Sequence, residues 1–186
     1  QSLMSNDGDR NTAIGTYALQ DNTSGGNNTA LGTYTLYENI NGNNNVSVGN
    51  YTLQDNTSGS DNTAIGVYAI QNNTSGMGNT GLGRQALLNN DTGDNNVAVG
   101  VNALVNNING DRNIAIGYQA GFSETGSNKL YIENSNSSTP LIYGEFDNDF
   151  VRINGGLKVN EVSDDEALLV THEIISNTGS FSTVKI

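Results

Sequence analysis

The sequence predicts an all-β fold, a parallel β-solenoid over residues 1–127 in which each coil takes 17 residues. The first observation behind this prediction is a short motif that ends in glycine and recurs seven times without an insertion or a deletion. The second is that a unit this short cannot bury its own apolar residues, so it becomes stable only when successive copies stack. The seven copies end at Gly15, Gly32, Gly49, Gly66, Gly83, Gly100 and Gly117, after a partial N-terminal copy.

The first strand of each coil spans the five residues that end at this glycine, as in 11–15. Its second and fourth positions share one face, because side chains alternate along a strand. The fourth position is always apolar and the second exchanges Thr with Val and Ile, so we expect this face to be buried. The two columns are Thr12, Thr29, Val46, Thr63, Thr80, Val97 and Ile114, and Ile14, Leu31, Val48, Ile65, Leu82, Val99 and Ile116.

Small residues fill the column between these two. Such a column indicates close packing, either against another wall of the coil or against another chain. The column is Ala13, Ala30, Ser47, Ala64, Gly81, Ala98 and Ala115.

A second strand is expected at 17–19 and its equivalents, followed by a polar turn rich in Asn and Gly, residues that tolerate positive φ. One asparagine column does not vary along the chain, and stacked amides of this kind hydrogen-bond along a solenoid. The predicted ladder is Asn11, Asn28, Asn45, Asn62, Asn79, Asn96 and Asn113.

Four tyrosines align at the 17-residue period, namely Tyr17, Tyr34, Tyr51 and Tyr68. Two interpretations stay open for this stripe. The rings stack on the faces of sugar rings, which makes the stripe a glycan site, or they pack on one another along the edge of the coil.

The period fails after Gly121, and residues 128–186 form a second, non-repetitive region. Strands are expected at 129–133, 141–146, 150–153 and 156–159, separated by turns. Residues 161–186 carry an acidic run and an apolar end, and the sequence does not decide between helix and strand there.

Composition and charge disfavour several classes of partner. The net charge is −12 and the seven basic residues form no cluster, so nucleic acid and anionic membrane surfaces are poor partners. There is no cysteine, and no window reaches the roughly 18 apolar residues of a membrane span. The chain starts at Gln1 inside a repeat, which suggests a processed chain or a fragment of a longer array.

No catalytic, cofactor-binding or metal site is predicted. His172 is the only histidine, and the acidic residues drift among turn positions, which disfavours a solenoid glycoside hydrolase. Two acidic turns, 6–9 and 91–94, resemble fragments of calcium loops, but solvated turns explain them. An ice-binding threonine face is disfavoured because that face is expected to be buried.

The core Asn11-Thr12-Ala13-Ile14-Gly15 and its copies resemble the head repeats of trimeric autotransporter adhesins, and more closely the Asn/Thr/Gly-rich repeats of phage tail fibres and secreted bacterial fibre proteins. Residues 130–134 and 140–149 are similar to segments that follow such repeats. The resemblance implies a left-handed parallel β-roll assembled as a homotrimer. In such a trimer we expect the small-residue column to be close-packed, and a head-to-tail filament is the competing arrangement.

Repeat, charge and resemblance together predict a non-enzymatic extracellular fibre segment, structural or adhesive: a tail-fibre shaft, a surface adhesin head or the subunit of a secreted filament. Its expected partners are copies of itself and neutral cell-surface glycans. Its expected location is the cell surface or the fibre of a virion or injection particle.

Overall fold

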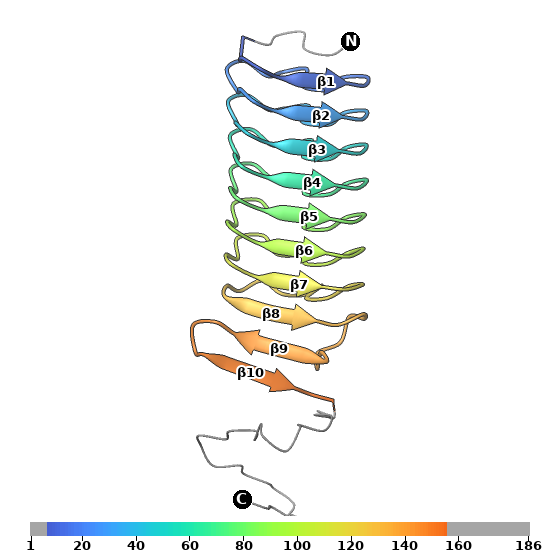
Figure 1. Ribbon diagram of the computed structural model, residues 1–186, viewed down its shortest axis with the longest axis vertical. Helices are drawn as coiled ribbons and strands as arrows, with labels where there is room; N and C mark the ends of the chain where they lie inside the picture. The colour runs from blue at the N-terminus through green and yellow to red at the C-terminus, as the bar shows by residue number, and fades with distance from the viewer. Residues whose placement is uncertain (1–6, 156–186) are drawn as a thin grey trace, which may run out of the picture. The chain divides into compact units, whose positions relative to one another are not determined.

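A computed structural model describes residues 7–155, and these residues belong to one compact unit. They contain no helix, and their ten strands form one sheet in chain order (Figure 1). The predicted parallel β-solenoid with 17-residue coils is confirmed. The strands are β1 Thr12–Ile14, β2 Thr29–Leu31, β3 Val46–Val48, β4 Thr63–Ile65, β5 Thr80–Leu82, β6 Val97–Val99, β7 Ile114–Ile116, β8 Lys129–Ile132, β9 Ile142–Glu145 and β10 Phe150–Ile153.

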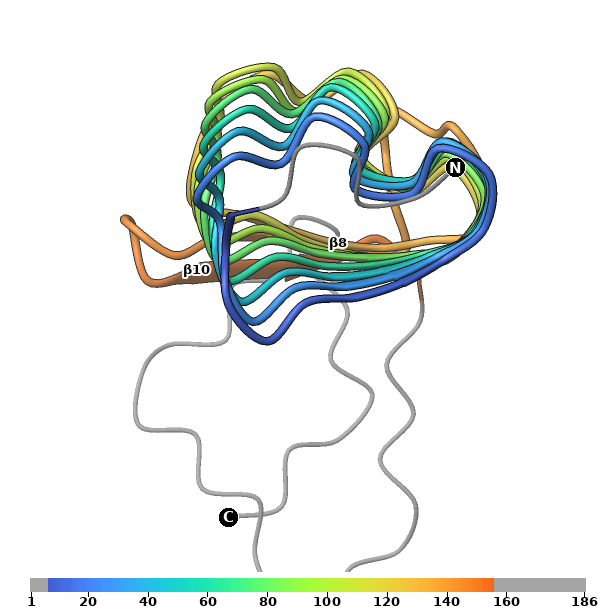
Figure 2. The same cartoon turned by 90° about the horizontal axis from the view of Figure 1, so that it is seen from above.

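The coils superpose when viewed along the stack, with the sheet as one flat wall and an undulating wall opposite it (Figure 2). Neighbouring strands from β1 to β8 are parallel, and from β1 to β7 equivalent residues pair, such as Ala13 with Ala30. The period of the sequence is therefore the register of the sheet.

The wall opposite the sheet is a run of turns, so the second strand expected at 17–19 is absent. Tyr17 and Leu19 have φ of 62° and 49°, and the same two positions repeat this left-handed backbone in the later coils. Hydrogen bonds still join adjacent coils here, as from the Leu19 N–H to the Thr35 carbonyl at 3.1 Å. Alternating positive φ keeps this wall compact without an extended strand.

The core lies between the small residues of the sheet and the large residues of the turn wall. Ala30 and Ala64 are fully buried, as are Leu36 and Leu53 opposite them. A Cβ built on Gly81 would lie 2.7 Å from Cγ1 of Ile70, so the coil has no room for two large side chains. The predicted burial of the Thr and Ile columns is therefore wrong, because the large residues of the turn wall already fill the interior.

The glycine that ends each strand is required by the stacking distance. Gly66 has φ of 132°, and a Cβ built there would lie 2.6 Å from the carbonyl oxygen of Gly83 in the next coil. All seven glycines that end the copies of the motif share this positive φ. A side chain at this position would push adjacent coils apart.

The predicted asparagine ladder joins the coils through backbone groups. Asn45 donates from Nδ2 to the Gly59 carbonyl at 2.9 Å, and its Oδ1 accepts from the Asn62 N–H at 3.0 Å. A second buried ladder, which our sequence analysis missed, bonds amide to amide at 2.6–3.1 Å. It comprises Asn22, Asn39, Asn56, Asn73, Asn90 and Asn107.

After the coils, β8 pairs parallel with β7, and β9 and β10 then add as antiparallel strands. These three strands match three of the four expected after residue 128. The fourth, at 156–159, lies outside the described residues, as do residues 161–186 with the acidic run and His172. Tyr131 of β8 points inward and packs against the end of the core.

Candidate functional site

The outer face of the sheet is a chemically uniform surface of the solenoid. Ile14, Leu31 and Leu82 are 62%, 44% and 45% exposed, although each belongs to a column that is apolar in every coil. The neighbouring column holds only Thr, Val and Ile. No charged residue occurs at these fourteen positions, which is unusual for a surface in contact with water.

The same face continues over β8, β9 and β10 although the strand direction changes. Strand pairing aligns Ile116 with Ile132, Ile132 with Ile142, and Ile142 with Ile153. The neighbouring column continues as Leu130, Gly144 and Val151. The non-repetitive segment therefore preserves the apolar outer face, which we call the outer sheet face.

The outer sheet face is as large as a small interface. Ten strands spaced about 4.8 Å apart give a strip about 48 Å long. Two columns of side chains make it about 10 Å wide, so its flat area is about 500 Å². That is near the upper end of the apolar patches on soluble monomers, and such patches often mark interaction sites.

The tyrosine stripe of the sequence analysis lies on the turn wall. Tyr51 stacks on Tyr34 and Tyr68 with ring centroids 5.4 and 5.2 Å apart, and Tyr37 adds a tilted contact with Tyr34. Partial burial and then the neighbouring tyrosines raise the pKa of Tyr34. The ring faces of Tyr51 are thus covered by Tyr34 and Tyr68. A glycan would meet the edges and hydroxyls of these rings.

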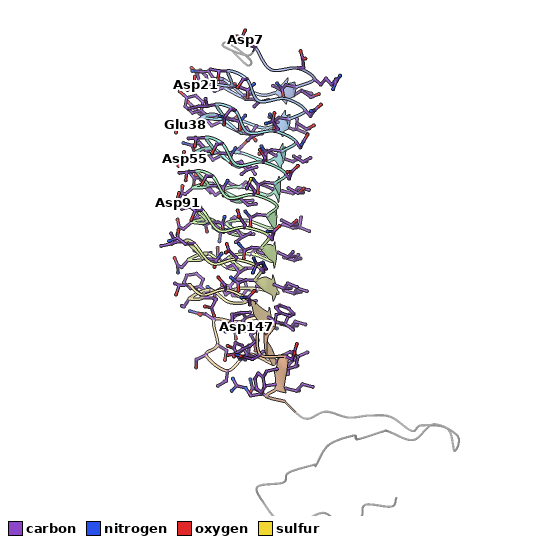
Figure 3. All side chains as sticks on the ribbon, turned by 90° about the vertical axis from the view of Figure 1, so that its left-hand side faces the viewer. Asp7, Asp21, Glu38, Asp55, Asp91 and Asp147 are labelled. Carbon is purple, nitrogen blue, oxygen red and sulfur yellow. The ribbon has the colours of Figure 1, made fainter. Side chains whose placement is uncertain are left out.

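Asp21, Glu38, Asp55 and Asp91 lie on the side of the coil away from the strands (Figure 3). Loss of hydration, followed by the charges of Asp55 and Asp21, raises the pKa of Glu38, and loss of hydration also raises that of Asp55. Within residues 7–155, no three His, Cys, Asp or Glu side chains come together as a metal site would require. Asp91 accepts a hydrogen bond from the Thr74 hydroxyl, and Asp94 accepts one from the Met77 N–H.

The inner face of the three last strands carries aromatic and charged residues. Cζ of Arg152 lies 5.3 Å from the ring centre of Tyr143, and Nζ of Lys129 lies 3.6 Å from Oε1 of Glu145. Burial, followed by the hydrogen bond to Glu145, raises the pKa of Tyr143 to about 12. That hydrogen bond is also the first cause that lowers the pKa of Glu145.

A cavity of about 370 Å³ opens where the repeat ends. Two of its residues replace members of regular columns: Gly121 stands where six coils have Leu or Ile, and Glu124 stands where six coils have the second-ladder asparagine. Our sequence analysis recorded the end of the period at Gly121 but did not predict a site there. The signal was these two exchanges in otherwise constant columns.

Comparison with known proteins returns no relative: no protein-family model, curated protein or solved structure matches the chain. Along the residues that the structure describes, no helix is long and apolar enough to cross a bilayer. The fold itself defines the class of protein, a β-solenoid repeat protein of about seven coils.

Proposed function

We propose that this chain is a non-enzymatic, structural segment of an extracellular fibre, and that it assembles as a homotrimer through the outer sheet face. The observation that carries the proposal is the continuity of that face: ten strands of two kinds present apolar and Thr side chains without a charge. The resemblance of the repeat to adhesin heads and tail-fibre repeats supports the same class.

A closed trimer suits a strip that is two columns wide. Around a threefold axis, the Thr/Val column of one chain meets the Ile/Leu column of the next, so each chain uses both columns once. A strip of about 500 Å² per chain is smaller than the roughly 800 Å² per partner of a standard interface. In a trimer the small area per chain is offset, because three such strips are buried together around one common axis.

The small-residue column, in contrast, does not take part in this proposal. Ala30, Ala64 and Ala98 are fully buried within the coil and are not available to another chain. The expected close packing of this column is with the opposite wall of its own coil, and the proposed trimer interface moves to the columns on either side of it.

Native mass spectrometry and light scattering of the whole chain test the proposal. Ile65→Lys places a charge on the outer sheet face, and Val67→Lys places the same charge beside the sheet; both side chains are 39% exposed. We expect three times 19.6 kDa for the parent and for Val67→Lys, and a monomer for Ile65→Lys. A monomeric parent, or two variants that behave alike, would overturn the proposal.

A head-to-tail filament is the alternative assembly. Concentration-dependent fibres in electron micrographs would favour the filament. A monomer that inhibits ice recrystallisation would favour ice binding, since the threonine column faces outward.

The adhesive part of the proposal concerns neutral glycans. A charge of −12 per chain repels phosphate- or sulfate-rich surfaces at low salt. The tyrosine stripe stays a candidate glycan site, through the edges and hydroxyls of its rings. Binding of the parent to neutral members of a glycan array, lost on replacement of Tyr34 and Tyr51 by Ser in a folded chain, would support it.

A further inference from the structure

The geometry points to a second ligand site in the cavity at the end of the coils, and we propose that it binds one neutral pyranose ring. The cavity is lined by Gly121, Phe122, Ser123, Glu124, Tyr131, Asn136, Ser137 and Ser138. These residues come from the last coil, from β8 and from the loop between β8 and β9, so the site exists only where the repeat stops.

The cavity arises because the seventh coil lacks its large core residue. Leu104 and the five equivalent residues before it are fully buried, and the next position is Gly121. Tyr131 enters the vacated space, and a Cβ built on Gly121 would lie 3.2 Å from its ring and 2.9 Å from Cδ2 of Leu104. The substitution therefore leaves an aromatic wall, Tyr131 with Phe122, beside an open volume.

The second exchange places a fixed acceptor in the same cavity. Glu124 occupies the position of the ladder asparagine, and its Oε1 accepts the N–H groups of Thr125 at 2.9 Å and Gly126 at 2.6 Å. Its Oε2 accepts the hydroxyl of Tyr131. Burial and this bond to Glu124 raise the pKa of Tyr131, so the phenol stays protonated. The carboxylate is thus held in one orientation with lone pairs left for further donors.

The rim of the cavity supplies polar groups with both donor and acceptor capacity. Asn136 and Ser138 are exposed, and neither side chain forms a hydrogen bond to another described residue. Both are therefore free to exchange water for a ligand, at little cost in protein contacts.

These features together match the surface of a sugar. A pyranose offers an apolar ring face for stacking on an aromatic side chain and hydroxyls that both donate and accept. The Glu124 carboxylate favours hydroxyl donors and opposes anionic ligands. A volume of about 370 Å³ lies at the small end of ligand pockets, which fits one ring and not an extended chain.

Saturation-transfer NMR of the whole chain with methyl glycosides of glucose, galactose, mannose and N-acetylglucosamine tests the site. Asn136→Ala removes a rim group without removing a hydrogen bond, so the fold should be unaffected. Its matched control is Asn41→Ala, an exposed asparagine of the second coil whose side chain likewise forms no hydrogen bond with a described residue. We expect at least one glycoside to bind the parent and Asn41→Ala, and to bind Asn136→Ala at least tenfold more weakly.

Gly121→Leu is a second, independent variant, because it restores the residue of the other coils. Leucine is compatible with the backbone there, since Leu19 and Leu104 have φ of 49° and 51° and Gly121 has 60°. The leucine must displace the Tyr131 ring, because a Cβ there would lie 3.2 Å from that ring and 2.9 Å from Cδ2 of Leu104, so the signal should be lost. Circular dichroism checks that the coils stay folded. The proposal would be overturned if the parent chain gave no saturation-transfer signal with any of the glycosides. A signal that survives Asn136→Ala but is lost on replacement of Tyr34 and Tyr51 by Ser would also overturn it.

Discussion

The coils and the segment from Gly121 to Gly155 share one sheet but differ in how they bury polar groups. In a coil, each buried ladder amide bonds to the same kind of group in an adjacent coil: Asn56 bonds to the Asn39 and Asn73 amides, and Asn45 bonds to the Gly59 carbonyl and the Asn62 N–H. Beyond Gly121, the polar groups bond to unlike partners, as Glu124 does with Tyr131. The coils therefore gain stability from repetition, and distinct chemistry becomes possible only where repetition ends.

Deletions test the repetitive side of this comparison most severely. Removing residues 46–62 takes out 17 residues and should leave a folded, shorter solenoid, because every ladder rejoins in register. Removing residues 46–54 shifts the columns by nine and should unfold the coils. Circular dichroism and thermal melting measure both, and equal tolerance of the two deletions would contradict the register.

Replacing one buried ladder asparagine should have the next largest effect. Asn56 donates to Asn39 at 2.7 Å and to the Gly59 carbonyl at 3.0 Å, and accepts from Asn73 at 2.6 Å. Asn56→Ala leaves buried partners unsatisfied and should lower the free energy of unfolding by about 2–4 kcal/mol. Asn41→Ala is the exposed control and should change it by less than about 0.5 kcal/mol in urea denaturation.

Two adjacent residues of β4 test which face of the sheet is inside. Ala64 is fully buried and Thr63 points outward. Ala64→Leu should therefore lower the free energy of unfolding by about 1–3 kcal/mol through overpacking, whereas Thr63→Leu should change it by about 0.5 kcal/mol. The reverse order in urea denaturation would restore the burial that the sequence predicted.

The tyrosine stack should make a smaller contribution. Tyr51→Ser removes contacts with two rings, at 5.4 and 5.2 Å, and should lower the free energy of unfolding by about 1–2 kcal/mol. Tyr118→Ser is a matched control, because Tyr118 is 50% exposed and has no ring contact within residues 7–155. A Tyr51→Ser chain as stable as this control would show that the stacked rings do not stabilise the coils.

The smallest effect is a pH dependence from the carboxylates of the turn wall. The pKa of Glu38 is raised, so its contribution to stability is present at pH 3 and is lost as the pH rises through its folded pKa. Glu38→Gln should therefore stabilise the chain by about 0.5 kcal/mol at pH 7 and not at pH 3. The pKa of Glu133 is lowered by the Asn134 and Leu141 N–H groups, so Glu133→Gln should change stability with the opposite sign. Thermal melting of both variants at pH 7 and pH 3 measures the two effects.

The sequence alone predicted the features that depend on the period. A spacing of 17 that never slips leaves stacking as the only way for Leu36 or Leu53 to become buried, and stacking aligns Ala13 with Ala30. It also predicted three of the strands after residue 128, since turn residues separate them. The second asparagine ladder was visible in the same columns, but turn asparagines are common on surfaces, and only the structure shows that these are buried.

Only the tertiary structure decided which side of each strand faces the core. Alternation along Thr63, Ala64 and Ile65 fits either orientation. The choice depends on the opposite wall, where leucine and isoleucine at positive φ fill the interior and leave space only for small residues. It also decided that Gly121 opens a cavity, because the consequence of a missing side chain depends on what enters the vacated space. The period can be read from the sequence alone. The width of a coil and the side chains that fill it depend on how the sheet and the turn wall pack against each other.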